Sequence, residues 1–448
     1  MKFNKAQSLT EERYTKYQDE YYKCKKNTIV RHALFNGPVT NLAKSGDESL
    51  ASDFLFNVEI PTMTATNQKS SGRCWIFAAC NVLREIVAKK LGIKDFELSQ
   101  NYVAFYDRLE KINYCLESII DLIDKEHDDR TLCHVLDNTF CDGGQWDMFV
   151  NIVKKYGIVP KKAMPETFQS SNTGLTGRLI HAELRKFAAK AQEIYQTEGI
   201  EKVRELKEEL LQKFYNFLTS AHGLVPTSFD FEYKDSENNY HVEKGLTPKS
   251  FFDKYFGSFI DEYVSVTNAP TKDKPFNTTF TVAYLGNVIE GKKVVHLNVS
   301  IERLTELTKT QLKNGEVAWF GSDCSMYSDR ETGIWDDKAW DYNTPFGLNY
   351  DFSKEVGLDY LASVMNHAMV LTGVQLDEND QPVRWKVENS WGTDKAFQGY
   401  YVATQSWFNR FVFQVVINKK YLNEEELKAL EKEPICLKPW DPMGSLAD

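Results

Sequence analysis

Apolar residues recur every three or four positions in residues 74–91, which predicts an amphipathic helix. Lys89 and Lys90 fall in its last turn, where positive charge is favourable, and Gly92 follows as a stop signal. We therefore expect this helix to begin at about Cys74 and to end just before Gly92.

A second helix is expected to begin near Ser99. Residues 177–220 form a longer amphipathic stretch that is interrupted near Gly199. Its many charges usually indicate a solvated helix face, although its length also suits an arm that packs on a neighbouring subunit. The first half of the chain is thus predicted to be mainly helical.

The pattern changes after Pro275, where short apolar runs replace the helical spacing. Strands are expected at residues 280–284, 294–298, 367–375, 383–389, 399–403 and 411–417. Because helices come first and strands follow, the order favours an α+β fold over βαβ winding. The length of 448 residues allows two or three domain-sized units, or one domain with large insertions.

Composition narrows the class of protein. With 54 basic and 64 acidic residues the net charge is −10, so a broadly basic nucleic-acid binder is not expected. No apolar run approaches the roughly 20 residues of a membrane span, and residues 1–27 lack the apolar core of a secretory signal. Eight irregularly spaced cysteines fit a reduced cytoplasmic chain better than a disulfide framework. Cys133, His134 and Cys141 lack paired metal-ligand spacing, so neither a metal nor another cofactor is expected.

Cys74 is the first candidate for chemistry, because it opens the predicted helix. A thiol in the first helical turn meets unpaired N–H groups and the positive end of the helix dipole, and both favour the nucleophilic thiolate. A cysteine that opens an apolar helix can also be a small core residue. For Cys80, inside the same helix, we prefer that interpretation.

Two later segments supply a base and an amide. His367 enters one apolar strand, and Asn389 ends another beside Trp391. Each alone is most simply a core histidine or a strand end. Together with Cys74, the imidazole can take the thiol proton and later protonate the leaving amine, while the Asn389 side chain accepts from the other ring N–H. Gln68 can donate to an oxyanion beside the Cys74 backbone N–H.

These segments resemble the active-site segments of papain-like cysteine peptidases. The resemblance rests on Gln68…Gly72-x-Cys74-Trp75, Asn366-His367-Ala368 and Asn389-Ser390-Trp391-Gly392. Ser71-Gly72-Arg73-Cys74-Trp75 and Asp142-Gly143-Gly144-Gln145-Trp146 are similar to the bleomycin hydrolase and aminopeptidase C branch. The resemblance implies a two-lobed papain-like fold, with a helical half, a β-barrel-like half and a large helical insertion.

The spacing of the motifs supports this branch. Cys74 and His367 are 293 residues apart, against roughly 130–150 in ordinary papain-like enzymes, which leaves about 150 extra residues. In the resembled branch such inserts build a homohexamer around a central cavity. The resemblance therefore implies self-association as well as peptide substrates.

The resemblance also assigns substrate-binding residues. Gly143 and Gly144 would form a backbone ledge that pairs with an extended peptide, and Trp391 would shield the hydrogen bond between Asn389 and His367. A Gly-Gly turn and plain core packing are the alternative explanations.

The tail from Pro434 onward has no periodicity, so by itself it should be extended and loosely held. In the resembled branch the C-terminal residues lie in the non-primed half of the cleft, block long substrates, and direct a carboxylate at the free amine of the substrate. Here residues 443–447 look like that blocking segment, which makes Ala447 and Asp448 candidates for substrate binding. Removal of single N-terminal residues, and bleomycin hydrolase-like activity, would follow.

Five segments are expected from these arguments. They are an N-terminal extension (1–54), a helical catalytic half with Cys74 (55–175), a helical oligomerisation insertion (176–275), a β-rich catalytic half with His367 and Asn389 (276–433) and a tail that enters the cleft (434–448). The predicted activity is that of a cysteine aminopeptidase. An endopeptidase on the same scaffold, or an inactive papain-like binding protein, are the alternatives.

Overall fold

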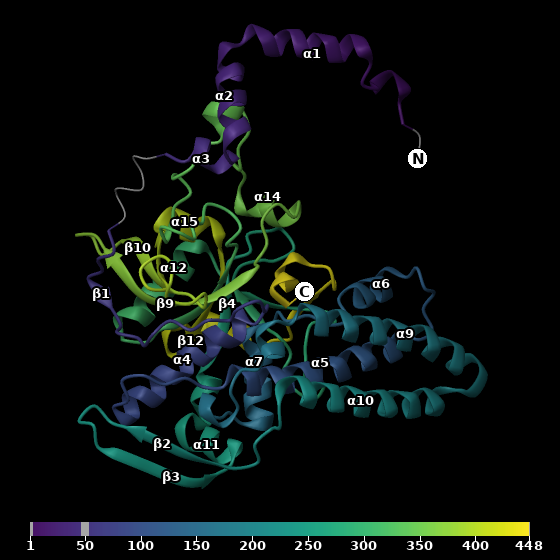
Figure 1. Cartoon of the computed structure of the whole chain (residues 1–448), viewed down its shortest axis with the longest axis vertical. Coiled ribbons are helices and arrows are strands. Elements are labelled where there is room, and N and C mark those ends of the chain that lie inside the picture. The colour runs from purple at the N-terminus through teal and green to yellow at the C-terminus, as the bar shows by residue number, and fades with distance from the viewer. Residues whose placement is uncertain (1–2, 46–52, 448) are drawn as a thin grey trace.

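The computed structural model describes residues 3–45 and 53–447. Residues 3–45 form an N-terminal arm of three helices, α1 (Glu11–Lys23), α2 (Lys25–Asn36) and α3 (Val39–Ala43), which projects from the rest of the chain (Figure 1). No residue of α1 or α2 is buried. The chain leaves helical geometry only briefly, at Cys24 and around Gly37.

The helical half follows the predicted pattern. Its main helices are α4 (Cys74–Leu91), α5 (Gln100–Asp121), α6 (Arg130–Asp137) and α7 (Trp146–Tyr156). α4 begins at Cys74 and ends at Leu91, and Gly92 follows in the left-handed conformation with φ of 66°. The Ser99 side chain caps α5 by accepting from the Tyr102 N–H. Both predicted helix starts are confirmed.

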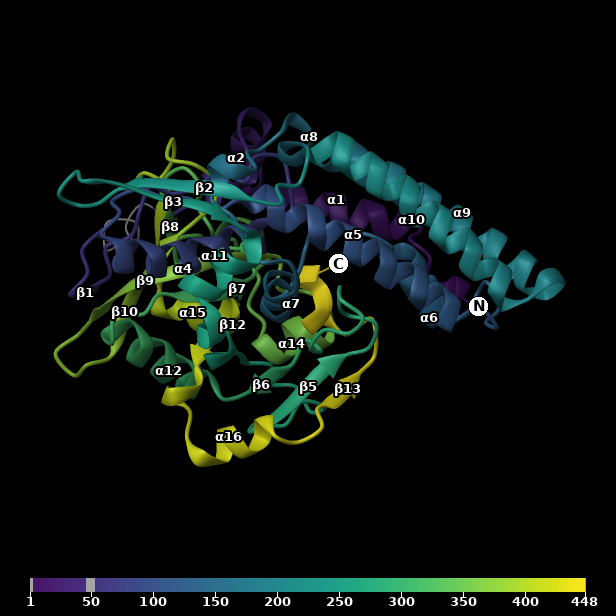
Figure 2. The same ribbon diagram turned by 90° about the horizontal axis from the view of Figure 1, so that it is seen from below.

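A helical hairpin extends beyond the body of the molecule (Figures 1 and 2). It consists of α9 (Gly174–Glu198) and α10 (Ile200–His222), which follow the short α8 (Phe168–Ser171). The break falls at Gly199, as predicted. The apolar stripes of both helices pack against α5, and their remaining faces are polar. A two-stranded ribbon, β2 (Phe229–Lys234) and β3 (Tyr240–Leu246), and α11 (Pro248–Tyr255) complete this region.

One large sheet forms the β-rich half, and it contains all six predicted strands. Its order is β13-β5-β6-β4-β12-β7-β9-β10-β11-β8, with β1 paired to β9. The strands are β1 (Val58–Glu59), β4 (Tyr263–Thr267), β5 (Thr278–Val282), β6 (His296–Asn298), β7 (Ala318–Ser322), β8 (Ile334–Trp335), β9 (His367–Leu376), β10 (Pro382–Glu388), β11 (Tyr400–Thr404), β12 (Val412–Asn418) and β13 (Ile435–Leu437). β4 belongs to this sheet, although its residues were assigned to the insertion.

Two hydrophobic clusters flank the sheet. One joins it to α4 and α7, and the other joins it to α12 (Ile301–Lys313) and α15 (Gln405–Phe411). The remaining short helices are α13 (Asn343–Phe346), α14 (Lys354–Asp359) and α16 (Glu424–Leu430). The α+β prediction is confirmed. Within the described part of the chain, every helix is too short or too polar to cross a membrane.

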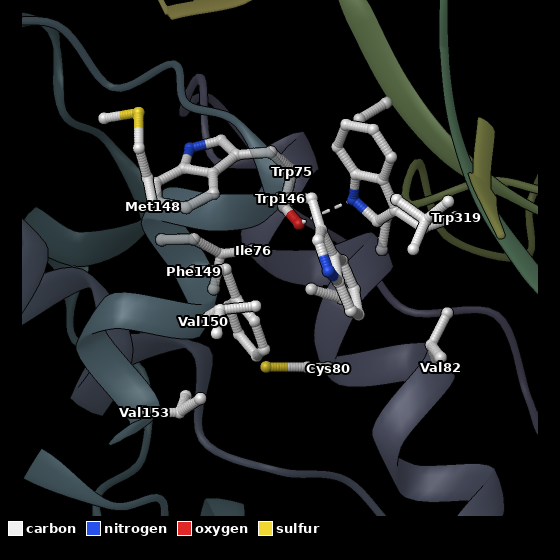
Figure 3. Close-up of a cluster of buried hydrophobic side chains, with 14 of the residues drawn as sticks. Trp75, Ile76, Cys80, Val82, Trp146, Met148, Phe149, Val150, Val153 and Trp319 are labelled. Carbon is white, nitrogen blue, oxygen red and sulfur yellow. Dashed lines mark hydrogen bonds between the residues drawn. The ribbon is translucent and has the colours of Figure 1, made fainter. Parts of the chain in front are cut away.

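The interior between α4, α7 and the sheet is tightly filled. Trp146 and Phe149 of α7 meet α4 there, and Trp319 of β7 donates from Nε1 to the Trp75 carbonyl over 3.1 Å (Figure 3). Cys80 lies among these side chains and is 1% exposed, as expected of a core residue. This packing fixes α4, and with it Cys74, against the sheet.

Candidate active site

Cys74 is the first residue of α4 and is only 4% exposed. The backbone amides of Trp75 and of Ala368, on β9, hydrogen-bond toward its sulfur. The residue that follows His367 is therefore in contact with the thiol. The structure thus brings together two segments that are 293 residues apart in the sequence.

The segment that leads into α4 is held by buried ionic contacts. The Arg73 guanidinium donates to both carboxylate oxygens of Glu166, over 3.1 and 2.9 Å, and its Nε donates to the Ser71 hydroxyl over 3.0 Å. The same guanidinium lies over the Phe77 ring. Such a bidentate pair restrains the backbone on the N-terminal side of Cys74.

His367 and Asn389 meet at one end of two adjacent strands. His367 begins β9 and Asn389 directly follows β10, and the antiparallel register pairs Val370 with Glu388. The Asn389 Oδ1 atom lies 2.9 Å from His367 Nε2. Since an amide oxygen only accepts, Nε2 carries the proton and Nδ1 is left free to act as a base.

Trp391 lies against the imidazole of His367. The two rings stack with centroids 4.9 Å apart and an interplanar angle of 25°. Trp391 itself is only partly buried. It is thus placed where it can limit water access to the hydrogen bond between His367 and Asn389.

Gln68 is fixed by the two segments that it joins. Its backbone N–H donates to the Ser390 carbonyl over 2.9 Å, and the Ser390 hydroxyl donates to Gln68 Oε1 over 2.6 Å. Its Nε2 donates to the Ser71 carbonyl over 2.6 Å, three residues before Cys74. The Gln68 Nε2 atom carries two N–H groups. One donates to the loop at Ser71, and the second is not used in this contact. The sequence motif contained Ser390 and Ser71, but neither had been assigned a role.

Burial changes the proton affinities of Cys74 and His367. It raises the pKa of the Cys74 thiol to about 11 and lowers the pKa of His367 to about 4, although the bond to Asn389 opposes the latter shift. The helix start had been expected to favour the thiolate, but loss of hydration outweighs it here. Proton transfer from Cys74 to His367 creates both charges together, and their attraction then offsets part of that cost.

Gly143 and Gly144 face different neighbours. A Cβ atom on Gly143 would collide with the Leu446 carbonyl of the tail, whereas one on Gly144 would lie 2.5 Å from the Trp75 ring. The Trp75 Nε1 also donates to the Asp142 carbonyl over 2.7 Å. Only Gly143 lies against the tail, so the two glycines are needed for different reasons.

The tail is folded rather than loose. Residues 442–447 form a turn of 3-10 helix, in which Met443 is fully buried and Leu446 is 4% exposed. The Ser445 hydroxyl donates to the Met365 carbonyl over 2.7 Å, and the Ala447 carbonyl accepts from the Cys141 thiol. The tail therefore occupies space beside Gly143. Asp448, a predicted substrate-binding residue, lies outside the described residues.

Lys111 is a residue of this region that the sequence analysis missed. Its ammonium group is buried, pairs with Asp107 over 2.9 Å and donates to the carbonyls of Cys141 and Gly143. It thus fixes the backbone on which the tail lies. No short motif could reveal it, because a lysine on a helix usually faces solvent.

Comparisons with known proteins agree with this geometry. A sequence profile described as the Peptidase C1-like family matches residues 8–444. The chain belongs to this family. It is 47% identical to aminopeptidase C of Listeria monocytogenes over 393 residues, which is 88% of each chain. It is 43% identical to aminopeptidase C of Lactobacillus delbrueckii over 423 residues, which is 94% of each chain.

A solved structure extends the likeness to three dimensions. PepW from Lactobacillus rhamnosis superposes with a TM-score of 0.95 at 41% identity, covering 98% of this chain and 99% of that chain. The predicted papain-like fold is therefore confirmed. As a member of the Peptidase C1-like family, the chain is a cysteine peptidase that acts on peptides.

Proposed function

We propose that this chain is a cysteine aminopeptidase in which Cys74, His367, Asn389 and Gln68 carry the reaction. The observation that carries the proposal is the buried tail, whose Leu446 and Ala447 lie on the Gly143 backbone beside the reacting groups. A substrate cannot extend through space that the tail already fills. Only a peptide whose N-terminus ends near Cys74 then fits.

The reaction follows from the positions of the polar groups. His367 Nδ1 takes the Cys74 proton, and the sulfur attacks the first peptide carbonyl. The Gln68 Nε2–H and the Cys74 backbone N–H stabilise the oxyanion. His367 then protonates the leaving amine, which departs and leaves a thioester on Cys74. Water, deprotonated by His367, hydrolyses the thioester and releases the amino acid.

Gly143, Trp391 and Ala447 are proposed to contact the substrate or its immediate surroundings. Gly143 would present its backbone to the first residue, and Ala447 would lie near the free amine. For Asp448 we propose, from the family resemblance alone, that its carboxylates face that amine. Gly144 would support the ledge through its contact with Trp75.

Deletion of residues 444–448 tests the proposal. The shortened chain should hydrolyse N-acetylated peptides and cleave internal bonds, which the whole chain should not. Cys74→Ala in both backgrounds is the control and should abolish all cleavage. Mass spectrometry of the products of a ten-residue peptide distinguishes the outcomes. An unchanged product pattern after deletion would contradict a blocking tail and favour the endopeptidase alternative, in which the tail plays no part.

We also propose that the chain assembles as a homohexamer. The N-terminal arm supports this, because its large apolar side chains are exposed and would be covered by a partner. These side chains include Tyr14 (57% exposed), Tyr22 (62%), Ile29 (68%) and Phe35 (87%). Light scattering should give six times the chain mass for the whole protein and less after deletion of residues 1–38. A monomeric whole protein would refute this.

A cytoplasmic location is proposed from the cysteines. Cys24 and Cys436 are exposed free thiols, which suits a reducing compartment. Recovery of the protein in the soluble fraction of gently opened cells, with all eight thiols titratable, is expected. Recovery in the culture medium instead would contradict it.

A further inference from the structure

A second charged group lies on the indole that stacks on His367. The Arg330 guanidinium carbon is 4.5 Å from the centre of the Trp391 ring. Arg330 is exposed and Trp391 is partly exposed. The positive charge of Arg330 also helps to lower the pKa of His367, so the electric field of the guanidinium reaches the imidazole. Arg330 therefore stands at the solvent edge of the reacting groups.

Arg330 is flanked by two acidic residues that are paired with other side chains. Its neighbours Asp329 and Glu331 are paired with Lys44 of the N-terminal arm and with Lys395, respectively. Within residues 3–45 and 53–447, no carboxylate lies within ion-pair distance of the Arg330 guanidinium. A stacked arginine without a carboxylate partner is a suitable receptor for an anionic group.

The backbone that carries Arg330 is held in place. The Asp329 Oδ1 atom accepts from the N–H groups of Glu331 and Thr332, over 2.9 and 3.2 Å. Nearby, the Val402 N–H of β11 donates to the Gly333 carbonyl over 2.8 Å. The guanidinium is thus presented from a fixed turn, so little order has to be gained on binding.

The course of a bound peptide brings it toward this turn. The tail fills the space beside Gly143, so the part of the substrate that follows the cleaved bond has to extend away from the tail. On the described surface, the partly exposed Trp391 stacks on His367, and the exposed Arg330 lies over the Trp391 ring. In a short peptide this leaving part carries a carboxylate close to the cleaved bond.

We propose that Arg330 is a specificity-determining residue that binds a carboxylate on the leaving part of the substrate. The carboxylate is either the C-terminus of a dipeptide or an acidic side chain that follows the cleaved bond. This rests on the proposed aminopeptidase function. The guanidinium matches a carboxylate with two parallel N–H donors, and stacking on Trp391 fixes its plane. Short peptides with a nearby carboxylate are then preferred over their amides.

Matched substrates test this proposal on the whole protein. Ala-Gly and Ala-Gly amide differ only in the terminal carboxylate, Ala-Glu amide and Ala-Gln amide only in the side-chain carboxylate, and alanine anilide has neither. Arg330→Gln should lower kcat/KM about tenfold for the member with the favoured carboxylate, mainly through KM. It should change kcat/KM of the substrates that lack this carboxylate less than twofold. Arg330→Lys should retain part of the preference, and Arg178→Gln, an exposed arginine of α9, should behave as wild type.

The pattern of loss decides the outcome. If kcat/KM falls only for Ala-Gly, Arg330 binds the terminal carboxylate. If it falls only for Ala-Glu amide, Arg330 binds the side-chain carboxylate. An equal loss on all five substrates, or none on any, overturns the proposal. If the wild-type protein fails to hydrolyse the anilide but cleaves internal bonds, it is the aminopeptidase function that fails, so the two failures are distinguishable.

Discussion

Beside Cys74 the chain has two regions of opposite character. Around Gly143 the backbone is covered by Leu446 and Ala447, which are almost completely buried. Trp391 is instead partly exposed, and the exposed Arg330 lies over its indole. The first region is filled by the chain itself, whereas the second is exposed to solvent.

This difference separates the groups proposed to carry the reaction from the regions proposed to select the substrate. The hydrogen bond between His367 and Asn389 and the contacts of Gln68 are set by adjacent strands and by the loop before α4, none of which involves the tail. The same reacting groups could therefore serve an endopeptidase. In the proposed function, the filled region would restrict the substrate to a free N-terminus, while the open region would accept leaving parts of different length.

The largest expected effect lies in the groups proposed to react, whose hydrogen bonds to one another do not involve the tail. Gln68→Ala should lower kcat by about 10²–10³, because one oxyanion donor is lost, with little change in KM. Ser390→Ala removes only the hydroxyl that positions Gln68 Oε1, so a loss of about fivefold is expected. Steady-state kinetics with alanine anilide measure both.

These two losses should also survive deletion of residues 444–448. A Gln68→Ala protein that keeps full activity would exclude this amide from the reaction. If its effect disappeared in the shortened chain, the position of the Gln68 amide would depend on the tail.

A smaller effect separates the two adjacent glycines. Gly143→Ala places a methyl group against the Leu446 carbonyl and should displace the tail, so hydrolysis of N-acetylated peptides should rise about tenfold, the equivalent of 1.4 kcal/mol. Gly144→Ala instead meets the buried Trp75 ring and should destabilise the fold by about 1–3 kcal/mol. Urea unfolding and the two substrate types distinguish these outcomes.

Gly144→Ala is the matched control for Gly143→Ala, since each adds one methyl group to the same turn. Equal behaviour of the two variants would mean that the tail does not lie on Gly143 in solution.

Much of this arrangement could be predicted from local sequence. The limits of α4 follow from the apolar spacing after Cys74 and from Gly92, and the strands that carry His367 and Asn389 follow from their apolar runs. These are short-range signals, so a single sequence suffices for them.

Contacts between distant segments could not be predicted in the same way. The folded tail depends on Met365 and Gly143, which lie far away in the sequence, and its own residues carry no periodicity. The roles of Lys111 and Arg330 depend equally on what other segments place beside them. The proton affinity of Cys74 is a third case, because the helix start is a local feature but burial is not.

The last and smallest effect concerns that proton affinity and joins the two regions. Because burial holds the pKa of the Cys74 thiol near 11, little thiolate forms at pH 7 in the whole chain. Deletion of residues 444–448 should expose the sulfur and lower this pKa, and each unit of lowering raises the thiolate fraction about tenfold. Alkylation of Cys74 by iodoacetamide at pH 7 should therefore accelerate, and the pH at which the alkylation rate begins to rise should be lower.

The exposed Cys24 is the control and should be alkylated at the same rate in both chains. Identical profiles for Cys74 would mean that burial by the tail is not what raises its pKa, and the filled region would then control substrate access alone.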